Sequence, residues 1–166
     1  MTDLSNEKLQ ITQKQLARKL ALIAVYQWQM TKNSYQDIYL ALQDDRDLSK
    51  DFRKCDAAYF QGLVRYVMDN HEAIDAKFTP LLDRGIDQLD QIELAALRLA
   101  TTELTNHIEV PFRVIINEFV NLTKKFGAEQ AHKFVNGMLD KLAKQIRTLE
   151  AGDSWLPALL LSWKLG

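Results

Sequence analysis

Apolar residues recur every three or four positions along most of this chain, and this spacing constrains the fold more than any other feature of the sequence. One such stretch contains Phe60, Leu63, Val64, Val67 and Ile74. On an α-helix these side chains would share one face. No stretch shows the sustained period-two alternation of a half-buried strand. The 6 glycines and 3 prolines of the 166 residues separate the periodic stretches, so the sequence predicts an all-α bundle of about seven helices.

Polar residues with capping side chains indicate where several helices begin. Ser34 with Asp37, and Asp90 with Glu93, have the spacing of a reciprocal N-terminal cap. Asp56 precedes the long apolar stretch and is expected to cap that helix.

The bounds of other helices are predicted from proline, glycine and the extent of the apolar pattern. We expect a first helix over about residues 10–30, a helix that opens at Pro111 and stops at Gly127, and a last helix over about 128–149. The acidic run at 44–47 is interpreted as a solvated loop.

The length fits a single domain, which we place at residues 1–152, followed by an apolar C-terminal extension at 153–166. This extension is too short to span a bilayer. We expect it to pack on the protein's own surface as an added helical turn. The alternative is an exposed patch for a partner or a dimer contact.

Nothing in the sequence indicates a membrane protein or a secreted one. No segment reaches the ~18 consecutive apolar residues that a membrane helix needs. The N-terminal sequence MTDLSNEKLQITQKQ is too polar for a secretory signal. The single cysteine, Cys55, excludes an intrachain disulfide and a zinc site made of cysteines alone. The expected location is therefore the cytoplasm.

Charge is unevenly distributed, although 21 basic residues nearly balance 22 acidic ones. Residues 1–36 contain five basic and two acidic side chains, 37–110 eight and fifteen, and 111–149 seven and three. Two basic ends thus flank an acidic middle, which hints at two different partners, although random bias among solvated helix faces would explain it equally well. The near-neutral total argues against a uniformly basic protein that coats nucleic acid.

The motifs of common catalytic sites are absent from the sequence. It has no glycine-rich phosphate loop, no G-x-S-x-G elbow and no H-E-x-x-H metal motif. The three histidines, His71, His107 and His132, are scattered. We therefore expect a protein that is not an enzyme and that has neither a cofactor nor a metal ion.

Five segments, in order along the chain, carry a resemblance to a known family. They are ARKLALIAVYQWQ (17–29), YFQGLVRYV (59–67), LDQIELAALRLATTEL (89–104), VPFRVIINEFVNLTKKFG (110–127) and HKFVNGMLDKL (132–142). Together they resemble the NusB family of bacterial transcription antitermination factors. The resemblance extends over about residues 14–149, and its most specific signals are the proline-led segment with INE and KKFG, and the motif KFVNG.

The resemblance implies an all-α fold of two small helical subdomains and a role in transcription. NusB proteins bind a boxA-type RNA element in ribosomal RNA leader transcripts, together with the small-subunit ribosomal protein that also serves as NusE. The heterodimer works in the RNA polymerase antitermination complex and promotes read-through of terminators. The expected partners of this chain are therefore boxA-type RNA, a NusE-type protein and that complex.

The resemblance also implies which residues contact RNA. The corresponding positions are Lys14, Gln15, Arg18, Lys19, Tyr26, Gln130, Lys133 and Phe134. The cations would neutralise phosphates, and the aromatic rings would stack on unpaired bases. Gln15 stands where the family usually has a basic residue, so we expect weaker RNA binding and a flatter salt dependence.

Several of these assignments have a structural alternative. Without the resemblance, Lys14, Arg18 and Lys19 would be interpreted as a solvated helix face. Phe134 fits a place in the core as well as it fits base stacking, and Trp28 is expected in the core.

An acidic edge is expected to contact the NusE-type partner. Glu93 matches the acidic position that the family links to this contact, and Asp87 lies nearby in the sequence. Ribosomal proteins are usually basic, so an acidic patch would attract and orient one. Asp90 is interpreted mainly as a helix cap, whereas Glu93 could serve both purposes.

Two other functions remain as alternatives. The chain could be a homo-oligomeric helical scaffold, because the resemblance extends to family members that form homodimers and the apolar segment at 154–166 offers a contact. It could instead be an RNA-binding module related to the N-terminal domain of ribosomal RNA cytosine methyltransferases, although 166 residues leave no room for a methyltransferase domain.

Overall fold

The computed structural model describes residues 3–148, and this part of the chain contains seven α-helices and no strand. The helices are α1 (Asp3–Thr31), α2 (Tyr35–Asp44), α3 (Arg46–Lys54), α4 (Ala57–Phe78), α5 (Gln91–Asn106), α6 (Phe112–Phe126) and α7 (Ala131–Ile146). Two short 3₁₀ helices, η1 (Thr79–Leu81) and η2 (Ile86–Gln88), connect α4 to α5. The all-α prediction is confirmed. The C-terminal extension at 153–166 lies outside the described residues.

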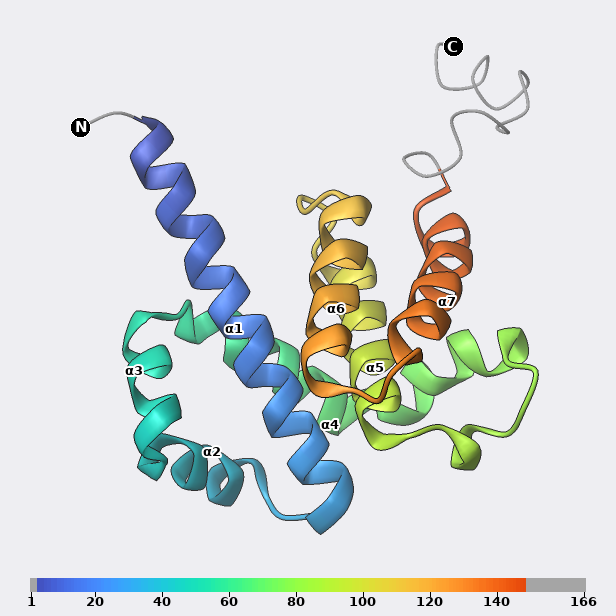
Figure 1. The fold of residues 1–166 in the computed structure, drawn as a ribbon, viewed down its shortest axis with the longest axis horizontal. Helices are drawn as coiled ribbons and strands as arrows, with labels where there is room; N and C mark the ends of the chain where they lie inside the picture. Colours follow the sequence, from blue (N-terminus) through green and yellow to red (C-terminus); the bar gives the residue numbers. More distant parts are fainter. Residues whose placement is uncertain (1–2, 149–166) are drawn as a thin grey trace.

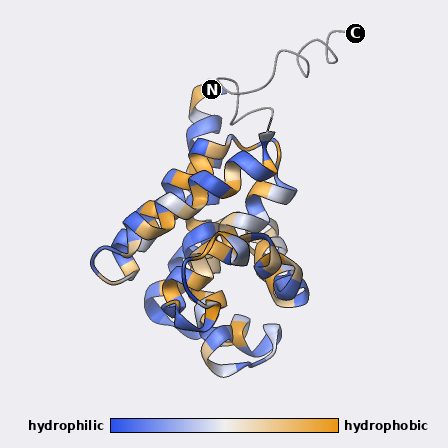
Figure 2. Cartoon of the chain, turned by 90° about the vertical axis from the view of Figure 1, so that its right-hand side faces the viewer, coloured by the Kyte–Doolittle hydropathy of each residue, from blue (hydrophilic) through white to orange (hydrophobic). Residues whose placement is uncertain are grey.

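Helix α5 lies at the centre of the fold (Figure 1). It packs against α1 and α4 on one side and against α6 and α7 on the other. Helices α2 and α3 pack on α1. Helices α1 to α4 thus form a first group, and α6 and α7 form a second group on the other side of α5. Every residue of α5 from Glu93 to Leu104 is buried, as expected for a helix that contacts neighbours on all sides. The remaining helices carry both hydrophobic and hydrophilic residues (Figure 2).

A continuous apolar core joins the two groups of helices. Large side chains with almost no solvent exposure include Phe60, Phe78, Phe119, Leu20, Leu97 and Leu139. Fully burying a side chain of this size contributes about 1.5–3 kcal/mol relative to leaving it exposed. No helix among the described residues is long and apolar enough to cross a membrane.

The predicted helix caps are present. The Asp56 carboxylate accepts a hydrogen bond from the backbone N–H of Tyr59 at 3.1 Å. The Asp90 carboxylate accepts bonds from the first turn of α5, and the Glu93 carboxylate accepts one from the Asp90 N–H, which completes a capping box. These contacts are local in sequence, which is why the spacing alone predicted them.

The prediction of a solvated loop at 44–47 is wrong. Helix α2 ends at Asp44, α3 begins at Arg46, and Asp45 alone separates them. The backbone N–H of Asp45 closes α2, and its carboxylate accepts hydrogen bonds from the N–H groups of Asp47 and Leu48 at 2.8 and 3.1 Å. One residue thus terminates one helix and caps the next.

Two helices also differ in length from their predicted bounds. Helix α1 begins at Asp3 rather than near residue 10, and its first turns extend beyond the body of the molecule (Figure 1). Helix α7 begins at Ala131 rather than at 128, because Gln130 adopts a left-handed conformation with φ of 79°. A non-glycine residue in this region interrupts a right-handed helix.

We predict that Asp45→Ala destabilises the fold by about 1 kcal/mol, because the substitution leaves the first N–H groups of α3 without their cap. Chemical denaturation followed by circular dichroism measures this change. Asp44→Ala is the matched control, since Asp44 is exposed and occupies the last position of α2. An equal loss of stability in both variants would contradict the capping role of Asp45.

Candidate nucleic-acid interface

Arg18 lies on α1 and is buried. Its side chain is 3% exposed, and its Nε donates hydrogen bonds to both carboxylate oxygens of Glu103 at 2.8 and 3.0 Å. A terminal guanidinium nitrogen donates a further bond to Oε2 at 2.6 Å. The other terminal nitrogen lies 3.8 Å from the carboxylate of Glu118 on α6. Charge-assisted pairs of this geometry are stronger than neutral hydrogen bonds.

Tyr59, on α4, completes the cluster around Glu103. Its hydroxyl donates a hydrogen bond to Oε2 of Glu103 at 2.6 Å. Burial, the negative charge of Glu103 and this hydrogen bond all raise the pKa of Tyr59, so the phenol stays protonated. Burial alone would lower the pKa of Arg18, but its hydrogen bonds to Glu103 and the attraction of that carboxylate outweigh burial and raise it.

This burial argues against the prediction that Arg18 presents its charge to RNA phosphates. The guanidinium is enclosed and already faces two carboxylates, so a phosphate could reach it only if the ion pair with Glu103 opened. Removing one partner of a buried pair costs several kcal/mol. Arg18 is therefore a structural residue that joins α1 to α5.

The other polar residues predicted on the middle of α1 are at least partly accessible, but each has a partner. The ammonium of Lys14 lies 3.3 Å from the carboxylate of Asp56, and that of Lys19 lies 2.8 Å from Asp51. Gln15 is exposed and donates a hydrogen bond to Glu118 at 3.0 Å. Exposed pairs of this kind contribute about 0–1 kcal/mol, so a phosphate could displace the carboxylates. The acidic partners nevertheless reduce the positive potential of this face.

Tyr26 faces a hollow between α1, α5 and α6. The hollow has a volume of about 420 Å³ and is also lined by Leu22, Ile23, Ile92 and Phe126. Tyr26 is half-buried, so its ring remains accessible from one side. An accessible aromatic ring beside apolar side chains is a suitable surface for stacking an unpaired base.

Trp28 is half-buried and packs against the core rather than inside it. Its ring contacts His71 edge-on at a centroid distance of 5.2 Å and lies against the apolar core. The guanidinium of Arg98 lies 5.6 Å from the ring centroid.

The predicted residues at the start of α7 differ in exposure. Gln130 and Lys133 are exposed, whereas Phe134 is half-buried. The guanidinium of Arg84 lies 4.3 Å from the centroid of the Phe134 ring. Lys133, Phe134 and Lys141 line a hollow of about 240 Å³ next to the η1 segment. Phe134 thus packs against the core and also borders a surface that carries two lysines.

The two residues predicted for the protein partner are not equally accessible. Glu93 is 8% exposed, because its carboxylate closes the capping box of α5 and lies 3.9 Å from Arg84. Asp87, in η2, is exposed. Arg84 contacts both Glu93 and the Phe134 ring, so the fold brings the predicted protein-binding and RNA-binding residues close together.

Two cations at this surface were not predicted. Arg84 covers Phe134, and Lys125, in the last turn of α6, lies 5.4 Å from the centroid of the Phe126 ring beside the Tyr26 hollow. The adjacent Lys124 is also exposed. The KKFG motif signalled the two lysines, whereas nothing near Arg84 in the sequence indicated its contact with α7.

A scan against family models matches residues 15–144 to the NusB family. The chain is 49% identical over 139 residues to the transcription antitermination protein NusB of Alteromonas mediterranea, covering 84% of this chain and 96% of that protein. It is 47% identical over 134 residues to the protein of the same name from Pseudomonas fluorescens, covering 81% and 78%.

Solved structures of similar proteins share the fold. The T. maritima NusB structure is 27% identical, with a TM-score of 0.65 over 79% of this chain and 90% of the other. A structure of the antitermination factors NusB and NusE in complex with dsRNA contains a chain that is 28% identical, with a TM-score of 0.63 over 79% and 96%.

We predict that Glu103→Ala destabilises the fold by about 3–5 kcal/mol, because it leaves the buried Arg18 without its partner. Thermal and chemical denaturation measure the loss. Glu118→Ala is the matched control: its carboxylate is partly exposed and farther from Arg18, so we expect a loss below about 1 kcal/mol. Similar losses in the two variants would contradict the structural role of the Arg18–Glu103 pair.

Proposed function

This chain belongs to the NusB family, and on that premise we propose that it is a transcription antitermination factor that binds boxA-type RNA together with a NusE-type ribosomal protein. It acts as a regulatory RNA-binding protein in the cytoplasm, without catalytic chemistry of its own, and supports read-through by RNA polymerase. The observation that carries the proposal is the match to NusB over residues 15–144, together with the likeness to a NusB that was solved with NusE and RNA.

The charge distribution supports a surface for RNA on the second group of helices. In the middle of α1 the lysines face carboxylates, and the guanidinium of Arg18 is buried. At the end of α6 and the start of α7, exposed lysines stand beside aromatic rings. Phosphate neutralisation and base stacking would therefore act together there.

The first turn of α5 connects the two halves of this surface. Ile92 lines the hollow of Tyr26 and Phe126. The next residue, Glu93, lies next to Arg84, which in turn covers Phe134. We therefore assign a continuous RNA-binding surface to the Tyr26 hollow, the α6–α7 connection with Gln130, and Lys133. Lys14, Gln15 and Lys19 contribute at its α1 side once phosphates displace their acidic partners.

The NusE-type partner is assigned to the segment that precedes α5. Asp87 is the exposed carboxylate of the predicted pair, and the buried Glu93 holds the helix start that positions it. A basic partner that binds here would lie next to the RNA surface. Its positive charge would then supply attraction for phosphate that this near-neutral chain lacks.

We predict that Lys133→Glu weakens binding of a boxA-type RNA in the presence of the NusE-type protein. It should also reduce the slope of log affinity against log salt by about one, because one phosphate contact is lost. Fluorescence anisotropy across a salt series measures both quantities. Lys50→Glu, an equally exposed change on α3, is the control and should leave the slope unchanged.

Two outcomes would contradict this assignment. The assignment of the RNA surface is wrong if Lys133→Glu and Lys50→Glu change the RNA affinity and its salt slope equally. The antitermination function itself is wrong if the unmodified chain binds boxA-type RNA no better with the partner than without it.

We predict that Asp87→Lys weakens association with the NusE-type protein, with a larger effect at low salt than at high salt, because a long-range attraction becomes a repulsion. Isothermal titration calorimetry at two ionic strengths measures this difference. Asp44→Lys makes the same charge change on α2, away from the η2 segment (Figure 1), and should bind normally. Equal weakening by both would indicate an effect of net charge only.

A further inference from the structure

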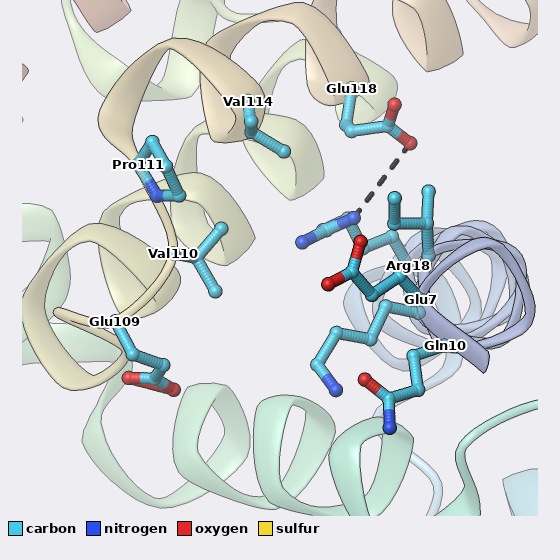
Figure 3. A pocket seen from close by; sticks show the side chains of 10 residues that line it. Glu7, Gln10, Arg18, Glu109, Val110, Pro111, Val114 and Glu118 are labelled. Atoms are coloured by element: carbon cyan, nitrogen blue, oxygen red, sulfur yellow. Dashed lines mark ion pairs between the residues drawn. The ribbon is translucent and has the colours of Figure 1, made fainter. Parts of the chain in front are cut away.

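A groove separates the first half of α1 from α6. Of the residues that the proposed function assigns to RNA, only Lys14 lines it. Ile11 lines it on α1, and Val110, Pro111 and Val114 line it on the opposite side. Its volume is about 320 Å³. Figure 3 shows Val110, Pro111 and Val114 across an open space from α1, with Arg18 paired to Glu118.

The apolar walls of this groove are exposed to solvent among the described residues. Ile11 is 58% exposed and Val114 is 42% exposed. Leu4, seven residues before Ile11 and therefore on the same face of α1, is 66% exposed. The first turns of α1 extend beyond the body of the molecule (Figure 1). They gain little stability from packing unless another segment covers this apolar face.

The charges on the groove disfavour nucleic acid and favour an apolar segment with a cation. Glu7 and Glu109 are exposed at its rim, and Glu118 stands at its inner end. The two cations that line the groove, Lys14 and Arg18, are paired with Asp56 and Glu103 outside it. Phosphate groups would be repelled by the carboxylates of the groove. An ammonium group carried by an apolar segment would be attracted to them.

The end of α7 is fixed at the rim of the same groove. Arg147 is 5% exposed and donates hydrogen bonds to the backbone carbonyls of Leu104, Val110 and His107. Val110 also lines the groove. The described part of the chain therefore ends beside the groove, and the 18 residues that follow are long enough to extend several tens of ångströms.

We propose that the apolar C-terminal extension of this chain, residues 153–166, binds in this groove. Its sequence DSWLPALLLSWKLG supplies two tryptophans and five leucines for the apolar walls, and Lys164 supplies the cation for Glu7 and Glu109. Leu4 and Ile11 precede the family match at 15–144 and the extension follows it, whereas the opposite wall with Val110, Pro111 and Val114 lies within the match. The contact is thus a feature of this chain in addition to the family fold.

Cysteine cross-linking tests the contact in the full chain. In a Cys55→Ser background, we combine Val114→Cys with Leu160→Cys, and expect oxidation to give an intramolecular disulfide at the monomer mass. The control replaces Val114→Cys with Leu40→Cys, on α2, which is 53% exposed and does not line the groove. We expect cross-linking at least tenfold faster with the groove cysteine than with the control.

Tryptophan quenching supplies an independent readout that needs no cysteine. Trp155 and Trp163 should become more accessible to iodide in the double variant Ile11→Glu/Val114→Glu, while the far-ultraviolet circular dichroism stays unchanged because both replaced side chains are exposed. The proposal is overturned by equal cross-linking at Val114→Cys and Leu40→Cys, by a covalent dimer as the main oxidised product, or by quenching that the double variant leaves unchanged.

Discussion

The buried ion pair between Arg18 and Glu103 is the contact on which the rest of the structure depends. It joins the middle of α1 to the central helix α5, and Tyr59 brings α4 to the same carboxylate. The carboxylate is fully enclosed, so only close hydrogen bonds can offset the cost of removing it from water. This requirement fixes how α1 lies along α5 and thereby positions the faces on both sides of α1.

This pairing also removes one cation from the proposed RNA surface. A cation that is used to satisfy a buried carboxylate no longer attracts phosphate, and the neighbouring lysines face Asp51 and Asp56. Exposed lysines beside aromatic rings lie instead at the end of α6 and the start of α7. The near balance of basic and acidic residues thus reflects internal pairing at one face and a modest basic surface at another.

Local features were predictable because their causes are local. Helix periodicity, the Ser34 and Asp56 caps and the capping box of α5 each depend on residues within one or two turns of each other. The predicted loop at 44–47 failed because a cluster of aspartates resembles a solvated turn, whereas Asp45 can close one helix and cap the next. The start of α7 was misplaced because periodicity does not reveal a left-handed residue such as Gln130.

The sequence by itself determined that this chain folds as a bundle of helices and resembles a family of RNA-binding antitermination factors. Only the tertiary structure decided which charged side chains remain available. Arg18 and Glu103 are 85 residues apart in the chain, and Arg84 reaches Phe134 through a contact that no spacing rule describes. Helix formation depends on neighbours in sequence, whereas the burial and pairing of a charge depend on which distant helices the core brings together.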